Sequence, residues 1–380
     1  MGDKTVYILG AGFSKSADAP LQSEIIEGIL SINEDDLRNL YKDFEKLRDL
    51  FDEWKKDFEY FLSEVFFLNN RKYRYLSLED IYTTIDRSIL NNTSLKNIPK
   101  DELFKYRKSI NALITTFFAT KIKNNLRVKH IRQFAKFLIR ERIKDFYINH
   151  DFDPLSVIST NWDIILENAL IPEMDLSKGM IDYCFYTHSF KENELGKKLR
   201  SGLYARGFGN YNLKILKLHG SMNWLQCQEC QRIYIDFFNH TALDHYIDRP
   251  NCYHCVNIRR NDNIDKGAYL NNVLITPTYL KDLNNFQLKL TWQIAGIELQ
   301  EASKIVFMGY SFPLADFELR HLLATSIRND AEIHIVLHQN DKPKIHTYKY
   351  FPAYRYRTFW GKRNIKFFYD GVEGYINENC

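Results

Sequence analysis

Short apolar runs alternate with longer amphipathic segments along the chain, and this alternation predicts a parallel sheet covered by helices. Each run has the length and the β-branched or aromatic content of a buried strand. The predicted strands are Thr5–Leu9, Leu155–Thr160, Leu213–Leu218, Asn272–Thr276, Lys304–Met308, Glu332–Leu337 and Ile365–Tyr369. Apolar residues recur at helical spacing in Leu21–Leu30, Ile164–Leu170 and Trp292–Glu301. The predicted fold class is therefore α/β, with a doubly wound, Rossmann-like parallel sheet.

A second kind of pattern fills residues 31–149. This stretch holds one proline, Pro99, and no glycine, and its apolar residues recur every three or four positions. The predicted helices are Leu37–Phe51, Trp54–Phe67, Leu78–Ile89, Lys105–Leu126 and His130–Phe146. We interpret residues 31–149 as a helical insertion into an α/β domain formed by residues 1–30 and 150–380. Its aromatic residues favour packing over ligand stacking, and such a layer could also contact a partner or sister subunits.

Four of the six cysteines form two Cys-x-x-Cys pairs. Cys227 and Cys230 are separated from Cys252 and Cys255 by 21 residues. This spacing is typical of a structural zinc site, in which four thiolates leave no open position for a substrate. We predict a zinc-ribbon module at residues 221–269, inserted in the α/β domain. The spare histidines of this module are predicted to be solvated: His240, His245 and His254.

Glycine and polar residues at the ends of the predicted strands are candidates for a site, because parallel strands bring their carboxyl ends to one edge of the sheet. Gly10 and Gly12 follow the first strand, where they suit either a tight turn or the close approach of a pyrophosphate. Asn161 and Asp163 follow the second strand, where they suit a helix cap as well as a binding site. His219 ends the third strand; it is either structural or, since imidazole titrates near neutral pH, a catalytic base.

The composition adds few restrictions. The chain has 52 basic and 48 acidic residues, which gives a net charge of +4, and the two signs are interspersed. Direct nucleic-acid binding is therefore not indicated by charge. No apolar run approaches the roughly 20 residues that cross a bilayer, and the two cysteines outside the pairs are isolated from each other. We expect a cytoplasmic protein in a reducing environment, with no membrane segment.

The order of these motifs resembles that of the sirtuins. Along the chain come Gly-Ala-Gly-x-Ser at residues 10–14, Ser-Thr-Asn-x-Asp at 159–163, His219-Gly220, the two cysteine pairs, and Gly-Tyr-Ser at 309–311. The resemblance covers residues 5–30 and about 150–380. It implies an NAD-binding domain in which NAD is the substrate and Zn²⁺ is structural.

The same resemblance implies roles for individual residues. Asn161 would place a water at the ribose, Asp163 would lie beside the ribose and nicotinamide, and His219 would act as the general base. The dinucleotide would contact the two glycine turns and the ends of further strands. The implied cofactor-binding residues are Gly10, Ala11, Gly12, Phe13, Ser14, Thr160, Gly309, Ser311 and Asn340.

Two departures from the deacylase pattern narrow the expected function. Lys15–Gln22 stands in place of a Gly-Ile-Pro-Asp-Phe-Arg segment, and Ile275–Tyr279 stands in place of the Phe-Gly-Glu strand that pairs with an acetyl-lysine peptide. Both differences fall on the acyl-peptide side, whereas the NAD-binding positions remain. The chain thus resembles the bacterial sirtuin-like NAD hydrolases (NADases) of anti-phage defence, which implies cleavage of NAD to nicotinamide and ADP-ribose.

Two alternatives stay open. The chain could be an NAD-dependent protein deacylase. It could instead be a non-catalytic NAD or ADP-ribose sensor that recruits a partner, such as a HerA-type ATPase, through the helical insertion. We also expect a homo-oligomer, because an unregulated NAD hydrolase would deplete its own host unless assembly or a partner controlled it.

Overall fold

The computed structural model describes most of the chain. The described residues are 3–68, 76–122, 128–144, 146, 153–189, 209–235, 242–259, 268–281, 283, 285–338, 351–361 and 363–380. Asn340, the predicted adenine contact, lies outside them, and so does His240.

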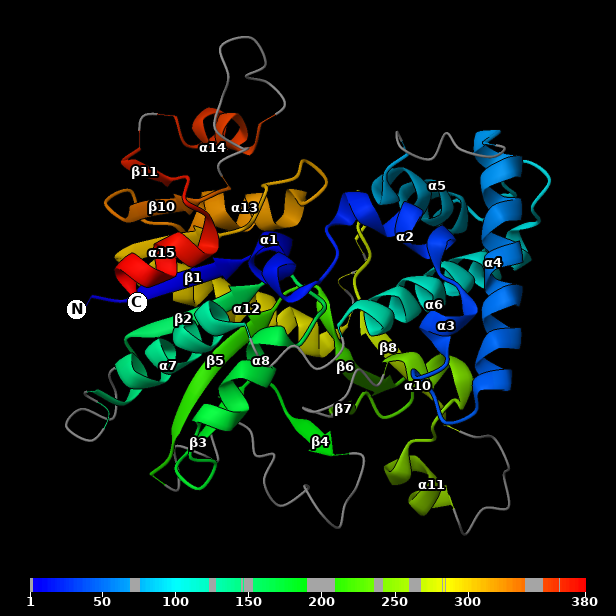
Figure 1. Cartoon of the computed structure of the whole chain (residues 1–380), viewed down its shortest axis with the longest axis horizontal. Coiled ribbons are helices and arrows are strands. Elements are labelled where there is room, and N and C mark those ends of the chain that lie inside the picture. Colours follow the sequence, from blue (N-terminus) through cyan, green and yellow to red (C-terminus); the bar gives the residue numbers. More distant parts are fainter. Residues whose placement is uncertain are drawn as a thin grey trace.

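Seven parallel strands form the main sheet, in the order β11-β10-β9-β1-β2-β5-β3 (Figure 1). Their bounds are β1 Thr5–Leu9, β2 Leu155–Ser159, β3 Gly179–Asp182, β5 Tyr211–Lys217, β9 Lys304–Met308, β10 Glu332–Val336 and β11 Ile365–Phe368. The chain builds β2, β5 and β3 on one side of β1, and β9, β10 and β11 on the other. The predicted doubly wound sheet is confirmed, and its direction switches at β1, where such folds place a ligand.

Helices cover both faces of this sheet. Tyr7 and Leu9 of β1 point to one face, into a core shared with α7 (Lys129–Lys144), α8 (Ile165–Leu170) and α15 (Gly371–Asn379). The alternate residues Val6 and Ile8 point to the other face, into a separate core. That second core is shared with α12 Phe286–Glu301, α13 Phe317–Ser326 and α14 Pro352–Trp360.

The sequence pattern assigns α7 to the predicted insertion, but the helix lies against the sheet. Its residues Phe134 and Phe137 pack edge-on against Tyr7 of β1, with ring centroids 5.2 and 6.1 Å apart. The helix also contacts α8, β5 and α15. The apolar face of α7 therefore serves the main sheet, although helical spacing alone could not show which partner the face would meet.

Five further helices form a layer beside the sheet (Figure 1). This helical layer consists of α2 Ile25–Ser31, α3 Glu34–Leu37, α4 Phe44–Phe66, α5 Leu78–Leu90 and α6 Leu103–Lys121. Helix α6 is its centre and contacts α2, α4 and α5. The predicted break between Phe51 and Trp54 is wrong: α4 continues through the exposed residues Asp52 and Glu53, because polar residues on the solvent side do not interrupt a helix.

A smaller four-stranded sheet, in the order β4-β7-β6-β8, carries the cysteines. Its elements are β4 Thr187–Ser189, β6 Gly220–Cys227, β7 Ile233–Ile235, β8 Leu270–Leu274, α10 Ala242–Ile247 and α11 Tyr253–Arg259. The prediction that Asn272–Thr276 extends the main sheet is wrong. This strand pairs antiparallel with β6. After His219 the chain leaves the main sheet, and β6 then offers a free edge for pairing. Strand β5 offers none, because it already lies between β2 and β3.

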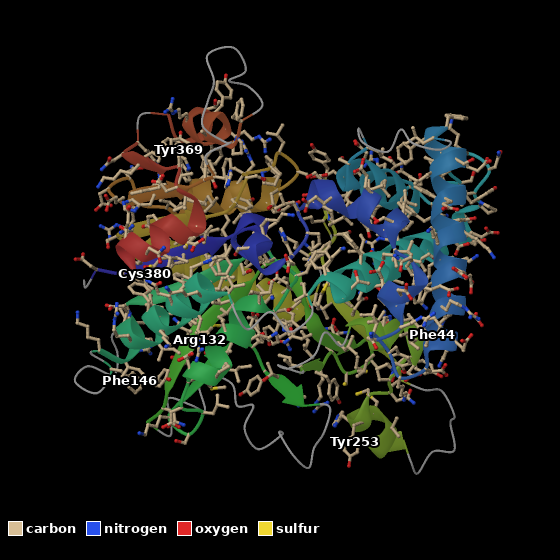
Figure 2. All side chains as sticks on the ribbon, in the orientation of Figure 1. Phe44, Arg132, Phe146, Tyr253, Tyr369 and Cys380 are labelled. Atoms are coloured by element: carbon tan, nitrogen blue, oxygen red, sulfur yellow. The ribbon has the colours of Figure 1, made fainter. Side chains whose placement is uncertain are left out.

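Side chains fill the space between these parts (Figure 2). Figure 2 places Tyr369 and Cys380 in the α/β half, Phe44 at the start of α4 and Tyr253 on α11. Short helical turns complete the described structure, at Ala11–Ser14 (α1), Lys15–Ala17, Gln22–Glu24, Lys100–Glu102 and Ile171–Glu173. None of the helices in the described part of the chain combines the length and the apolar character needed to cross a membrane.

Candidate functional site

Two glycine turns touch each other at the carboxyl ends of β1 and β9. Gly12 donates its N–H to the carbonyl of Gly309 at 2.8 Å. A Cβ on Gly12 would lie 2.8 Å from that oxygen, and a Cβ on Gly309, whose φ is +63°, would lie 2.3 Å from the nitrogen of Phe13. Glycine is therefore required at both positions. The N–H groups of Gly10 and Gly12 are used within the protein, so these glycines act by allowing close approach of backbone.

A cavity of about 1330 Å³ opens at these strand ends. Most of the predicted site residues line it: Ala11, Gly12, Thr160, Asn161, Asp163, His219, Gly309 and Ser311. Phe13 and Ser14 are buried. The carbonyl of Gly10 accepts from the N–H of Phe13 and so closes the first glycine turn. The structure thus brings together residues from four separate parts of the sequence.

Asn161 is fixed to the first glycine turn. Its Nδ2 donates to the carbonyl of Gly10 at 2.9 Å and to Oγ of Ser14 at 3.1 Å. Because a carbonyl only accepts, the first bond settles which end of the amide is nitrogen. In the described part of the chain no hydrogen bond engages Oδ1, so this oxygen is the atom of Asn161 that remains for a ligand.

Asp163 lies just before α8, whose N-cap residue is Ile164. Its Oδ1 accepts from the N–H of Ile165 at 3.1 Å, at the start of α8, while the side chain also lines the cavity. Burial raises the pKa of Asp163, and the nearby Lys217 ammonium only partly offsets this rise. Lys217 donates to the carbonyl of Asp163 and lies 3.1 Å from Glu167.

His219 lies between the two sheets. Its Nδ1 is 3.2 Å from the carbonyl of Thr160, and its own carbonyl accepts from the N–H of Ile275 at 2.9 Å. Its Nε2 is 3.0 Å from Oδ1 of Asp316, where the distance fits an ion pair although the angles fall outside those of a hydrogen bond. The side chain is 13% exposed, toward the cavity.

Asp316 is a site residue that the sequence analysis missed. It precedes α13 at the N-cap position, yet its side chain makes no capping bond. The carboxylate instead accepts from the hydroxyl of Tyr310 at 2.6 Å and lies 3.1 Å from Nζ of Lys281. Burial would raise the pKa of Asp316, but His219, Lys281 and Tyr310 together hold it well below its usual range.

A second histidine lines the same cavity. His130, at the start of α7, has its Nε2 2.9 Å from Oγ of Ser16 and its Nδ1 3.8 Å from a carboxylate oxygen of Glu373. Burial lowers the pKa of His130, and the Glu373 carboxylate opposes this shift. These residues come from three distant segments, so no local sequence motif could predict that they meet.

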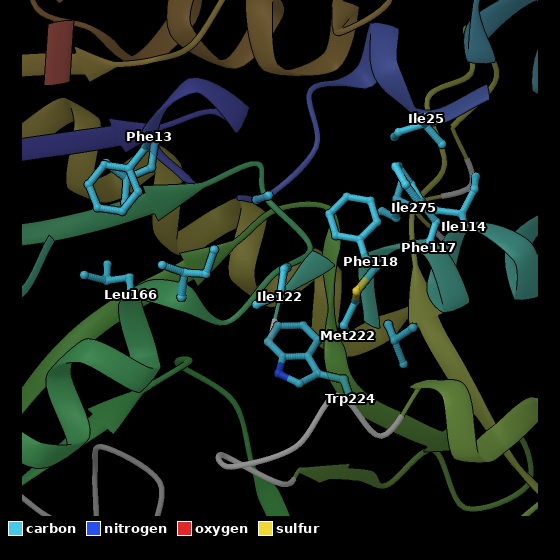
Figure 3. Packing of buried hydrophobic residues seen from close by; sticks show 14 of the residues in the cluster. Phe13, Ile25, Ile114, Phe117, Phe118, Ile122, Leu166, Met222, Trp224 and Ile275 are labelled. Carbon is cyan, nitrogen blue, oxygen red and sulfur yellow. The ribbon is translucent and has the colours of Figure 1, made fainter. Parts of the chain in front are cut away.

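The helical layer reaches the cavity through α2, α5 and its central helix α6. Phe118 of α6 and Ile275, which follows β8, both line the cavity. Figure 3 shows Phe118 and Ile122 near Met222 and Trp224, with Phe13 farther away. The layer is therefore packed directly against the site and against the start of the cysteine sheet.

The four paired cysteines converge. Their sulfur atoms all lie within 4.8 Å of one another, and Cys227 to Cys255 and Cys230 to Cys252 are 3.7 and 3.6 Å apart. Four sulfurs held 2.3 Å from one zinc ion would be about 3.8 Å apart, so the set fits a structural zinc ion. The hydroxyl of Tyr234 lies 3.2 Å from the sulfur of Cys252 and adds a polar neighbour to the ligand set.

The cysteine site is remote from the cavity. Strand β6 runs over eight residues from Gly220, beside His219, to Cys227, and its seven residue-to-residue steps span roughly 20 Å. One prediction about this module is wrong: His245 is buried, and burial lowers its pKa to about 4. His254 is half-buried.

Comparisons with known proteins gave matches only among solved structures. No protein-family model matches the chain, and no curated protein matches it. One match, from work on the mechanism and regulation of Sir2 enzymes, is 12% identical with a TM-score of 0.38, over 99% of this chain and 90% of that one. A Sir2 homologue in complex with 2′-O-acetyl-ADP-ribose is 13% identical with a TM-score of 0.40, over 99% and 89%. Sir2Tm bound to a propionylated peptide is 12% identical with a TM-score of 0.38, over 99% and 91%. At these TM-scores no function is transferred to this chain.

Proposed function

We propose that the chain is an NAD glycohydrolase, which cleaves NAD with water to nicotinamide and ADP-ribose. The observation that supports this most is the convergence of Asn161 and His219, from the ends of the neighbouring strands β2 and β5, on one cavity beside the paired glycine turns. This cavity lies at the switch point of a doubly wound sheet, where such folds bind nucleotides.

The cavity has the room and the charges that a dinucleotide needs. Its volume of about 1330 Å³ exceeds that of ordinary small-molecule pockets. Lys15 and Arg355 line it and would neutralise the diphosphate, and Arg355 donates to the carbonyl of Ser311 at 3.0 Å. The backbone of the second glycine turn would support the adenosine half.

The reaction breaks the bond between the nicotinamide nitrogen and C1′ of the ribose. The bonding electrons leave with nicotinamide, which becomes neutral, and the ribose carries the positive charge until a water oxygen bonds to C1′. The Oδ1 of Asn161 would orient this water, and His219 would receive the proton that the water loses. Buried carboxylates at the cavity, Asp163 and Asp316, would favour the developing positive charge.

The direct test is to incubate the purified protein with NAD and to measure nicotinamide and ADP-ribose. Equal release of the two products, abolished in Asn161→Ala, is the expected result. Tight NAD binding with no product at high enzyme concentration, with or without a partner, would instead favour the sensor.

A second enzymatic function has one structural feature in its favour. Beyond the glycine turns the cavity has an apolar part, lined by Ile25, Ile26, Phe118 and Ile275, which suits an acyl chain. In that case the chain would be an NAD-dependent deacylase. An acetylated peptide would then yield O-acyl-ADP-ribose together with nicotinamide, whereas the hydrolase yields ADP-ribose with or without the peptide.

We propose further that assembly controls the activity, in the setting of cytoplasmic anti-phage defence. The helical layer has apolar side chains on its surface, among them Phe67, Leu90 and Phe104, and its helix α6 reaches the cavity. Self-association or a partner such as a HerA-type ATPase could order the site through this layer. Full-rate NAD cleavage by a dilute monomer without any partner would contradict this.

A further inference from the structure

The contacts of His219 constrain where its protons lie. The carbonyl of Thr160, 3.2 Å from Nδ1, can only accept a hydrogen bond, so Nδ1 carries a hydrogen. Nε2 lies 3.0 Å from the Asp316 carboxylate. If Nε2 had no hydrogen, two acceptors would face each other at this short distance in a largely buried place. A proton on Nε2 removes the repulsion and turns the contact into an ion pair.

Asp316 is built to remain a carboxylate. It is 4% exposed, and such a group is ionised only when it has cationic or hydrogen-bonding partners. Tyr310 donates to its Oδ2 at 2.6 Å, and Lys281 lies 3.1 Å from its Oδ1. Lys281 is itself fixed by the carbonyl of Ala315 at 2.6 Å and by Glu318 at 3.0 Å.

The other groups that face this pair do not replace Asp316. From the end of β2, Asp163 lines the same cavity, but it is engaged by the N–H of Ile165. From α12, Trp292 lies beside the imidazole with ring centroids 6.5 Å apart and brings no charge. From α13, Arg320 stacks on the ring of Phe312, 4.4 Å from its centroid. Asp316 is thus the carboxylate in contact with Nε2.

We propose that Asp316 is a positioning residue that holds a proton on Nε2 of His219 in the ligand-free protein, and that Lys281 limits how firmly this proton is held. The inference rests on the proposed function, since it assigns the proton state of the residue that accepts a proton there. His219 becomes a base only when this proton leaves. The rate of NAD cleavage should therefore fall on the acidic side of a limit that the carboxylate sets.

Two substitutions should move that acidic limit in opposite directions. Asp316→Asn removes the negative charge that retains the proton, so the acidic limb of kcat/KM against pH should move to lower pH, by about one pH unit or more. Lys281→Met removes a positive charge beside the carboxylate, so the limb should move to higher pH. Asp330→Asn, an exposed carboxylate paired with Arg328, is the matched control and should leave the limb in place. A limb that stays in place in both test variants, or moves the same way in both, overturns the proposal.

A measurement without NAD separates this inference from the proposed function. In ¹⁵N spectra of histidine-labelled protein near neutral pH, both ring nitrogens of His219 should carry hydrogen, and in Asp316→Asn only Nδ1 should do so. His219→Gln identifies the signals among the 11 histidines. A hydrogen-free Nε2 in the wild-type protein overturns the proposal even if NAD is cleaved. The doubly protonated ring supports the pairing even if no nicotinamide is released, and in that case only the proposed function fails. If Asp316→Asn does not fold, Lys281→Met and the wild-type spectrum still decide.

Discussion

The two edges of the seven-stranded sheet both bury paired charges, but only one of these groups lies beside a cavity. Near the amino ends of the strands, Lys4 lies 2.6 Å from Glu298, and Lys214 lies 2.5 Å from both Glu298 and Asp153. Arg142 joins this network, 3.7 Å from Asp153. At the carboxyl ends, His219, Asp316 and Lys281 surround a cavity, which no residue of the amino-end network lines.

This difference separates stability from chemistry within one sheet. At the amino edge each buried charge faces an opposite charge, so the charges serve mainly the fold. At the carboxyl edge the side chain of Asn161 is held through its Nδ2, while its Oδ1 makes no hydrogen bond in the described part of the chain and can bind a ligand. Substitutions at the amino edge should therefore change mainly stability, and those at the carboxyl edge mainly turnover. Substitutions in the cysteine module, which is remote from both edges, should change metal content.

The largest effect is expected at the cysteines. Cys227→Ser together with Cys230→Ser should abolish the binding of one zinc ion per chain and unfold the small sheet, because the free energy of binding a structural zinc, of order 10 kcal/mol, is available only to the folded module. Metal content and melting temperature are the measurements. Cys184→Ser, outside the cluster, should retain the metal. Folded wild-type protein without zinc would contradict this expectation.

The next largest effect concerns turnover at the carboxyl edge. Asn161→Ala and His219→Ala should each lower kcat by about a thousand-fold or more, equivalent to about 4 kcal/mol in the barrier, while NAD binding and the melting temperature change little. The two losses should not add, because a positioned water without a base, or a base without a positioned water, leaves little to remove. Near-normal cleavage by a well-folded His219→Ala variant would show that its role is structural.

The reverse signature is expected at the amino edge. Lys214→Met should lower the free energy of unfolding by about 3 to 5 kcal/mol, because it leaves Glu298 and Asp153 buried without this partner. Cleavage of NAD per folded molecule should be unchanged. Lys366→Met, which breaks an exposed pair with Glu332, is the control and should cost less than about 1 kcal/mol. Lost activity in folded Lys214→Met would break the comparison between the edges.

The smallest effect concerns a buried group that belongs to neither edge. Burial lowers the pKa of His245 to about 4, with Lys108 and Arg249 acting in the same direction. An unfolded chain binds this proton below about pH 6.5 but the folded chain does not, so the stabilisation is complete above pH 6.5 and is lost as the pH falls toward 4. The total is about 3 kcal/mol.

Denaturation between pH 7 and 5 tests this expectation. The wild-type protein should lose stability across this range more steeply than His245→Gln, and the difference between the two cancels any common effect of zinc release. Parallel curves for the two proteins would mean that His245 takes up its proton equally well in the fold.

The sequence predicted those parts of the molecule whose signals are local. The strands β1, β2, β9 and β10, the glycine turn at Gly10 and the cysteine pairs are each written in a few consecutive residues. Closely spaced glycines, closely spaced cysteines and apolar runs are features of consecutive residues, so the sequence alone could predict them. The short strands β3 and β4 were missed because runs of three or four residues do not stand out from a loop.

The rest of the site depends on contacts that no pattern records. Asp316 reads as an ordinary first residue of a helix, and only Tyr310, Lys281 and His219 together make it a buried carboxylate. Ser16 and His130 meet across 114 residues of sequence. The second sheet was likewise invisible, because only the antiparallel pairing of β6 with β8 decides which sheet β8 joins.

The contact between Gly12 and Gly309 also determines when the cavity of a newly made molecule can form. These residues are 297 positions apart, and a ribosome adds roughly 5 to 20 residues per second, so roughly 15 to 60 seconds separate their synthesis. Strand β1 pairs with β9, and His219 contacts Asp316, only after residues 304–316 have been synthesised. A nascent chain that has not yet reached β9 therefore has no finished cavity, and truncated translation products ending before β9 would lack the second glycine turn and Asp316.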